Sequence, residues 1–400
     1  LQALASKIIV WPEGLNLAGT IDSKIKASGK VNLENPSKIK LKGNINFKKL
    51  RIQTAAIKQT VKLNGNVVLS STKIVPELKV KMGKEDLNLK MKILNPLSII
   101  FAKNGKGKKT SVDFKLKSKR LNLDKILSSS DGVATEPNSP LPKKNPIVPD
   151  VNLDGRIELA STVYQNLKLK DFKMDIRMRD RILHTDVKGV LYGGTLNQTS
   201  QANLKNPKKG KIKTKVTLKG VDVNPLINDY NDQLMLTSPL SKSISKMDNT
   251  VYGKINLNFN LNSVGVPATY FDNAKANLTS NILNGKIKNS KMLNSINSAY
   301  GSLSKIGFKV SSLKDGTLHF SNLKNKMKLS NGKLILESLK IKKTIFGDLD
   351  MKGALSKNGK LNLKALNLLS LKDSKKISKN PRAALAFPFQ GERAQVFMKI

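Results

Sequence analysis

The sequence contains no cysteine, and this absence excludes disulfide scaffolds, thiolate metal sites and cysteine nucleophiles. Only two histidines and one tryptophan occur, and aromatic residues make up 5% of the chain. So few histidines disfavour a histidine-based catalytic or zinc centre. No apolar run approaches the ~20 residues of a membrane-spanning helix. The composition therefore favours a protein that is not an enzyme, and we expect neither a cofactor nor a metal ion.

Lysine, in contrast, is abundant. The chain has 72 Lys and Arg against 28 Asp and Glu, a formal net charge of +44, and 8 of the 72 basic residues are Arg. Proteins that read nucleic acid favour arginine, because its planar fork binds guanine and phosphate through two hydrogen bonds. Dispersed lysine is typical of a solvated surface that is drawn to anionic membrane surfaces. Nucleic acid is not expected as a partner.

Alternation of apolar residues with Lys, Asn or Asp is the dominant pattern of the chain. It recurs at 78–82, 87–93, 112–116, 172–178 and 255–261. A period of two places the apolar side chains on one face of a strand and the polar ones on the other. Strands of this kind belong to antiparallel sheets with one solvated face. The pattern predicts a mainly β fold with a long curved antiparallel sheet or sheets, in an open groove or β-taco-like structure, and a few short helices.

Glycine-containing motifs separate or interrupt the alternating runs. Asn-Gly at 64–65, 284–285 and 331–332 and Asp-Gly at 154–155 predict tight turns, because both dipeptides tolerate positive φ. A looser repeat, apolar-x-Gly-x-apolar, occurs around Gly43, Gly65, Gly155, Gly253 and Gly353. Glycine inside a strand pattern predicts a bulge or a bend.

Helices are expected to be few and short, at 123–129, 224–234, 268–280 and 291–306. Residues 128–150 lack alternation and hold five of the fifteen prolines of the chain. Such a composition is typical of a linker or a long exposed loop. We therefore predict an N-terminal β domain over 1–127, a linker over 128–150, and a second β domain with short helices over 151–400.

Few residues are candidates for chemistry. His184 and His319 lie on strand patterns and are interpreted as exposed strand-face residues. Tyr192-Gly193-Gly194 lacks the Lys-Ser/Thr of a phosphate-binding loop and predicts a hairpin or bulge. Four aspartates that alternate with basic residues are interpreted as cross-strand charge pairs rather than catalytic acids: Asp171, Asp175, Asp180 and Asp186.

The apolar face of the expected sheet needs a cover, and the sequence supplies too little helix to provide it. A second sheet, closure into a barrel, or an apolar ligand would each supply one. A lipid-facing barrel is disfavoured, because aromatics are scarce and lysine recurs at every second position. An open apolar face that holds acyl chains fits best. The expected lipid contacts are Val80, Leu87, Leu89, Met91, Phe172, Met174, Ile176 and Met178.

Several stretches carry a family resemblance. Residues 151–370 resemble the AsmA family of Gram-negative envelope proteins. The N-terminal third resembles the family in its general pattern, with less specific motifs. The matching stretches are 151–159, 167–172, 189–196, 219–226, 315–318 and 361–363, and Pro388-Phe389-Gln390-Gly391 resembles the family's final strand. None of these motifs is catalytic.

The resemblance implies a periplasmic protein that is similar to bridge-like lipid transfer proteins. Such a protein would carry phospholipid acyl chains in a β-groove, contribute to outer-membrane assembly, and be held in the inner membrane by an N-terminal helix that this chain lacks. Two other functions stay open at this point. The first is a scaffold whose sheet edges dock other envelope proteins; the second is a polyanion binder.

Overall fold

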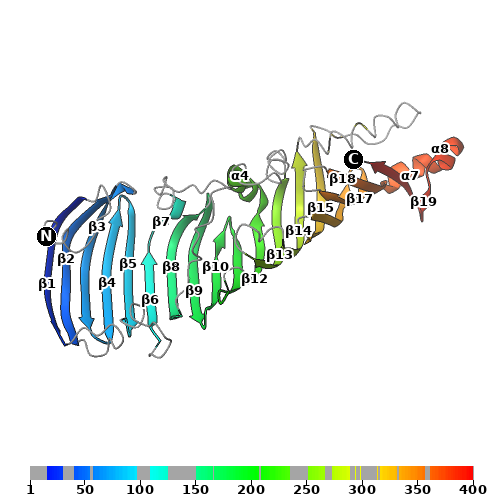
Figure 1. Ribbon diagram of the computed structural model, residues 1–400. Coiled ribbons are helices and arrows are strands. Elements are labelled where there is room, and N and C mark those ends of the chain that lie inside the picture. The colour runs from blue at the N-terminus through cyan, green and yellow to red at the C-terminus, as the bar shows by residue number, and fades with distance from the viewer. Residues whose placement is uncertain are drawn as a thin grey trace. The chain divides into compact units, whose positions relative to one another are not determined.

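The fold is mainly β, as predicted. A computed structural model describes residues 16–29, 40–54, 57–96, 109–124, 150–164, 166–206, 209–234, 251–265, 273–288, 293, 298, 313, 316–330, 333–355 and 361–399. These residues form 20 strands in an open sheet and three short helices (Figure 1). The chain divides into two compact units. Unit 1 comprises Leu1–Val190 and Gln198–Lys211, and unit 2 comprises Leu191–Asn197 and Ile212–Ile400.

Unit 1 is built from long strands. Its elements are β1 (Asn16–Ser28), β2 (Lys40–Thr54), β3 (Ile57–Ser70), β4 (Lys73–Met82), β5 (Glu85–Leu94), β6 (Ser111–Ser118), β7 (Leu121–Asn122), β8 (Asn152–Tyr164) and β9 (Leu167–Arg179). Three further strands place residues in both units: β10 (Ile182–Leu191), β11 (Gly194–Asn203) and β12 (Gly210–Asp222).

Neighbouring strands of unit 1 pair in chain order, and all but two of these pairings are antiparallel. The strands β1 to β6 form five consecutive antiparallel pairs, and β8 pairs antiparallel with β9. The exceptions are β6 and β7, which both run parallel to β8. A parallel pair needs a crossover of a dozen or more residues. The chain between Ser118 and Asn152 is long enough to supply it.

Unit 2 combines the remaining strands with all three helices. Its elements are α4 (Val223–Leu234), β13 (Val251–Gly265), β14 (Lys275–Lys288), β15 (Thr317–Ser330), β16 (Lys333–Thr344), β17 (Gly347–Leu355), β18 (Leu361–Leu368), α7 (Leu371–Ser378), α8 (Pro381–Ala386), β19 (Phe389–Gln390) and β20 (Arg393–Lys399). Strands β13 to β18 form antiparallel neighbours, and β20 pairs with both β18 and β19.

A closed hydrophobic core holds unit 2 together. Its apolar face packs against Val223 at the start of α4 and Ile377 of α7. Phe346, Ile341 and Met351 have no exposed surface. Among the large side chains of the described residues that are fully buried, all but Thr110 belong to unit 2. The apolar face of unit 2 is therefore covered by the unit's own side chains.

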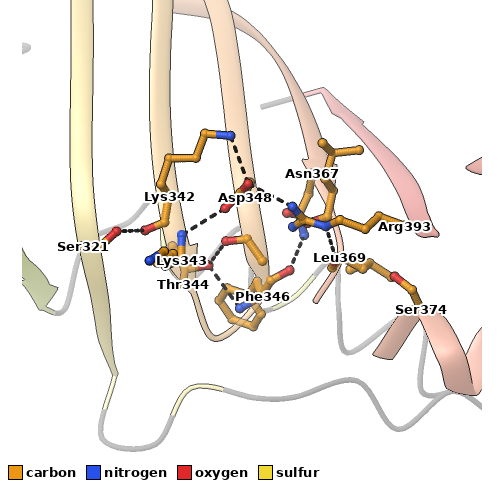
Figure 2. A network of polar contacts seen from close by, with 12 residues as sticks. Ser321, Lys342, Lys343, Thr344, Phe346, Asp348, Asn367, Leu369, Ser374 and Arg393 are labelled. Atoms are coloured by element: carbon orange, nitrogen blue, oxygen red, sulfur yellow. Dashed lines mark hydrogen bonds and ion pairs between the residues drawn. The ribbon is translucent and has the colours of Figure 1, made fainter. Parts of the chain in front are cut away.

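A polar network joins β16, β17, β18 and β20 at one end of this core (Figure 2). Asp348 accepts hydrogen bonds from the backbone N–H of Lys343 at 2.9 Å, from Lys342 Nζ at 3.0 Å and from Arg393 at 2.9 Å. Arg393 also donates to the backbone carbonyls of Leu368 and Leu369. Because this one guanidinium joins a carboxylate on β17 to the end of β18, it fixes the last strand to the sheet.

The pKa of Asp348 makes the stabilising effect of this network depend on pH. Burial raises the pKa of Asp348, but the Lys343 N–H, Lys342 and Arg393 lower it by more, so that it lies below its usual value. A carboxyl whose pKa is depressed in the folded state stabilises the fold above the unfolded-state pKa of about 4. That contribution is lost as the pH falls through the lower, folded pKa.

We therefore expect Asp348→Asn to lower the melting temperature of the protein at pH 7, and by less as the pH falls below about 4. Thermal unfolding followed by circular dichroism at pH 7, 5 and 3 measures this difference. A difference between variant and parent that stays constant over this range would contradict the assignment of the carboxylate as the ionised centre of the network.

The structure confirms one expected helix and overturns part of another. The prediction at 224–234 is confirmed by α4. The prediction at 268–280 is wrong over 275–280, because these residues begin β14, where Ala276, Leu278 and Ile282 follow a period of two. Of the other two predictions, Leu293, Ser298 and residues 123–124 are helical, and the rest lies outside the described residues. Helices α7 and α8 were not predicted.

Three of the turn predictions are wrong, because Asn64-Gly65, Asp154-Gly155 and Asn284-Gly285 lie inside β3, β8 and β14. The first and third of these dipeptides accompany register irregularities instead. Asn284 has a φ of 46°, and the register of β13 against β14 shifts at Gly253, which confirms the predicted bulge there. The Asn-Gly at 331–332 lies outside the described residues, between Ser330 and Lys333, which pair across β15 and β16.

The compact units also divide the chain at a different place from the predicted boundary at 128–150. Strands β6 and β8 lie on either side of that segment and pair along eight residues each, from Ser111 opposite Asn152 to Ser118 opposite Leu159. This pairing makes the two strands neighbours in unit 1. The segment itself falls almost entirely outside the described residues.

Candidate functional site

The apolar face of unit 1 is a set of side-chain rows that cross the strands. Because directly paired residues point to the same side of a sheet, the registers define these rows. The two longest cross eight strands, from β1 to β9. They are Ile21, Phe47, Gly65, Leu78, Leu89, Leu116, Ile157 and Met174, and Ile25, Gly43, Leu69, Ile74, Ile93, Val112, Leu153 and Met178.

All eight residues expected to contact lipid lie on this apolar face. Leu89, Met174 and Met178 belong to the two long rows. The others form shorter rows beside them: Met91 with Phe114, Gly155 and Ile176; Leu87 with Val80 and Leu63; and Phe172 with Leu159. Sequence reasoning named residues of β4, β5 and β9 and omitted those of β6 and β8 between them. The alternation in 112–116 and 153–159 carries the same signal.

The apolar face of unit 1 is only partly buried. Met178 is 7% exposed, whereas the other seven predicted residues are half-buried. None of the three helices belongs to the described part of unit 1, and all of its strands lie in a single sheet. Within the described residues, no second layer therefore covers this face, in contrast to the closed core of unit 2.

On the apolar face of unit 1, an aromatic ring lies over a glycine of the neighbouring strand. Phe114 pairs with Gly155 across β6 and β8, and its ring occupies the space that a side chain at Gly155 would fill. A Cβ built at Gly155 would come within 2.2 Å of the ring. Glycine opposite an aromatic residue lets the ring lie flat over the neighbouring backbone. The glycine at this position is thus required by packing rather than by a turn.

We expect Gly155→Ala to destabilise unit 1 by about 1–3 kcal/mol, because the added methyl group displaces the Phe114 ring. Urea unfolding monitored by circular dichroism measures the change. The double variant Gly155→Ala with Phe114→Leu serves as the control, since the smaller side chain restores space. If the single variant were as stable as the parent, the ring would not lie over Gly155.

The opposite face of unit 1, which we call the charged face, carries a lattice of cross-strand ion pairs. Arg156 on β8 lies 2.7 Å from Asp175 on β9, and Asp154 pairs with Arg177 at 3.5 Å and with Arg179. On β6, Lys115 and Lys117 both contact Glu158. Hydrogen bonds from Lys117 and Lys115 lower the pKa of Glu158.

Two grooves run along the charged face. The larger, of about 710 Å³, is lined by residues of β4, β5, β6, β8, β9 and β10, and the smaller, of about 400 Å³, by residues of β5, β6, β8 and β9. Five acidic and five basic side chains line the larger groove, together with His184. This balance disfavours the groove as a polyanion site, because its cations already have acidic neighbours.

The other sequence candidates fall into structural roles. Asp175 pairs with Arg156, and Asp180 pairs with Lys109 at 2.6 Å, while Asp171 and Asp186 line the two grooves. The histidines are exposed on their strands, as interpreted. His184 belongs to unit 1 and His319 to unit 2.

The structure confirms the hairpin predicted at the glycine pair 193–194. Tyr192 and Gly193 have positive φ and form the turn between β10 and β11. The Tyr192 hydroxyl donates to Asp229 on α4, and its carbonyl accepts from the Asp222 N–H at 3.1 Å. The turn therefore fastens α4 to the sheet of unit 2 and has no features of a phosphate site.

Among the described residues, no cluster of three or more His, Asp or Glu side chains is arranged to hold a metal ion. No helix in this part of the chain has the length and apolarity to span a membrane.

The fold and the site define a class: an open-sheet β protein in which one unit has a closed core and the other leaves a continuous apolar face half-buried. Comparison with protein-family models, with curated proteins and with solved structures finds no match to this chain. The apolar face of unit 1 is therefore the basis on which a function can be argued.

Proposed function

We propose that the protein binds phospholipid acyl chains on the apolar face of unit 1 and carries them within the Gram-negative envelope, without catalysing a reaction. The single observation that supports this proposal is the pair of apolar rows that cross eight strands with no covering layer in the described residues.

The physical argument rests on area and length. Burial of apolar surface stabilises by about 25 cal/mol per Å², so an uncovered apolar face favours any apolar cover. Eight strands at ~4.8 Å spacing span roughly 34 Å, which exceeds the length of an extended phospholipid acyl chain. Leucine, isoleucine, valine and methionine dominate the rows. An acyl chain needs no hydrogen-bonding partner, and these side chains offer none.

The two units suggest a division of roles. The core of unit 2 is closed by α4, α7 and its own side chains, so we restrict acyl-chain binding to unit 1. Lysines near the strand ends of unit 1, such as Lys73 and Lys119, are exposed and would attract anionic headgroups. A periplasmic location with an inner-membrane anchor, and a contribution to outer-membrane assembly, extend the proposal on the strength of the AsmA-like stretches alone.

A second candidate is a scaffold for the assembly of envelope proteins. The closed core of unit 2 favours it for that unit, since a face filled by its own side chains leaves no room for a ligand. The half-buried apolar face of unit 1 favours the lipid-binding function for unit 1.

Lipid extraction and native mass spectrometry of the protein, purified without detergent, test the proposal. We expect about one or more phospholipids per chain, and transfer of fluorescent phospholipid from donor vesicles to the protein. A protein that carries no lipid and takes none from vesicles would overturn the proposal and leave the scaffold as the better account. Tight binding of duplex DNA at physiological salt would favour the polyanion binder instead.

A further inference from the structure

The C-terminal part of unit 2 contains two short helices, α7 and α8, between β18 and β19 in the chain (Figure 1). Neither helix was predicted from the sequence, and neither belongs to the apolar face of unit 1. Exposed lysines belong to α7, and an exposed leucine belongs to each helix. This combination carries an inference that is separate from acyl-chain binding.

One side of α7 is fixed to the core. Asp373, Ser374 and Ile377 are buried, and Ile377 belongs to the core of unit 2. The Ser374 hydroxyl accepts a hydrogen bond from the Ala394 N–H at 3.1 Å, and Ser370 caps the helix by accepting from the Asp373 N–H. Because these contacts fix the rotation of α7 about its axis, they also fix which side chains point away from the core.

The outward side of α7 is basic. Lys372, Lys375 and the C-cap residue Lys379 are exposed, and their spacing of three and four residues places them along one side of the helix and its C-terminal end. No ion pair to these three lysines is present among the described residues. Lys376 lies beside them and is 3.7 Å from Asp373. A positive field therefore remains on this surface.

Each of the two helices also carries an exposed leucine. Leu385 on α8 is 91% exposed, and Leu371, at the first position of α7, is 50% exposed. Single exposed apolar residues are common on protein surfaces. Here two leucines accompany lysines on consecutive helices, which is the composition of a helix that lies in a membrane interface.

We propose that the outward side of α7 and α8 binds the surface of an anionic phospholipid bilayer. The lysines attract the headgroups, and Leu385 and Leu371 enter the interface below them. A nucleic acid would use the lysines but leave the leucines in water. A bilayer uses both. The inference of bilayer binding depends only on this surface. The further inference that lipids are exchanged there rests on the proposed function.

Co-sedimentation with phosphatidylcholine vesicles that contain phosphatidylglycerol tests this proposal. The charge-reversal variant Lys372→Glu, Lys375→Glu, Lys379→Glu is expected to bind at least about 100-fold more weakly, because loss of each lysine costs about fivefold and each glutamate adds repulsion. Leu385→Ser is expected to weaken binding about tenfold at unchanged charge. Because Leu385 is almost fully exposed, its replacement should leave the fold intact, which circular dichroism checks.

The high net charge of the chain makes a matched control necessary. Lys79→Glu, Lys170→Glu, Lys188→Glu changes the net charge equally at exposed positions of unit 1, and we expect less than a threefold effect. Equal losses in the two triple variants would overturn the proposal, because binding would then follow net charge alone. Unchanged binding of Leu385→Ser would overturn it as well and would favour a purely electrostatic partner.

The two proposals fail separately. The α7–α8 variants should retain the lipid that co-purifies with the parent protein, since they leave the apolar face of unit 1 unchanged. Loss of vesicle binding with full lipid retention is the expected result. If the parent carried no lipid but its vesicle binding still depended on Leu385, the proposed function would fail and the membrane contact would stand.

Discussion

Replacement of Met174 by aspartate is expected to reduce the lipid that co-purifies with the protein at least about tenfold. Met174 lies at the β9 end of a long apolar row, opposite Ile157, and is half-buried. A carboxylate there places a charge where the proposed acyl chain lies, and the desolvation of that charge opposes binding. Quantitative mass spectrometry of extracted phospholipid, normalised to protein, measures the loss.

The control lies on the charged face of the same strand. Lys173 is exposed and lies opposite Glu158, and Lys173→Asp introduces the same side chain with no effect expected on lipid retention. Phe172→Lys tests the apolar face with the opposite charge and should act as Met174→Asp does. If both apolar-face variants kept the lipid of the parent, the acyl chains would have to lie elsewhere. Circular dichroism of all three variants separates loss of lipid from loss of fold.

Replacement of Arg393 by alanine is expected to lower the free energy of unfolding of unit 2 by about 3 kcal/mol. The variant leaves Asp348, whose side chain is 17% exposed, without one of its cations. It also leaves the carbonyls of Leu368 and Leu369 without their side-chain donor. For a unit of this size, such a loss corresponds to a fall in melting temperature of roughly 10 °C.

Lys342→Ala provides the matched comparison, because Lys342 contacts the same carboxylate at 3.0 Å but is 50% exposed. Exposed ion pairs contribute little, so we expect a loss within about 1 kcal/mol. Differential scanning calorimetry of both variants measures the difference. Equal destabilisation would show that Arg393 contributes no more than an exposed surface cation, and that β20 is held by its strand pairing alone.

The period-two pattern predicted the strands well because strand geometry is local. Leu87, Leu89 and Met91 had to share a face once they belonged to a strand, whatever their neighbours. The same reasoning failed at Asn64-Gly65 and Asn284-Gly285. A dipeptide that tolerates positive φ suits both a turn and a bulge, and the partner strand decides between them. The helix expected at 268–280 is wrong over 275–280, because Ala276 and Leu278 also fit a period of two.

The pairing of β6 with β8 could not be predicted, since it joins strands on either side of a long proline-rich segment. Register between distant strands depends on packing that no local pattern encodes. Helices α7 and α8 were missed for a related reason. They are short, and the hydrogen bond that fixes α7, from the Ala394 N–H to the Ser374 hydroxyl, comes from a later strand.

The sequence by itself determined that this protein is an amphipathic β-sheet protein, because alternation fixes two unlike faces on every strand. It also determined the wide dispersal of the +44 charge, since lysine recurs at alternate positions throughout. Only the tertiary structure decided which apolar face is covered. Unit 2 closes its face with α4 and α7, whereas the described part of unit 1 has no such layer. The physical reason is that the elements that cover an apolar face are distant from it in the sequence, and their packing against it depends on long-range contacts.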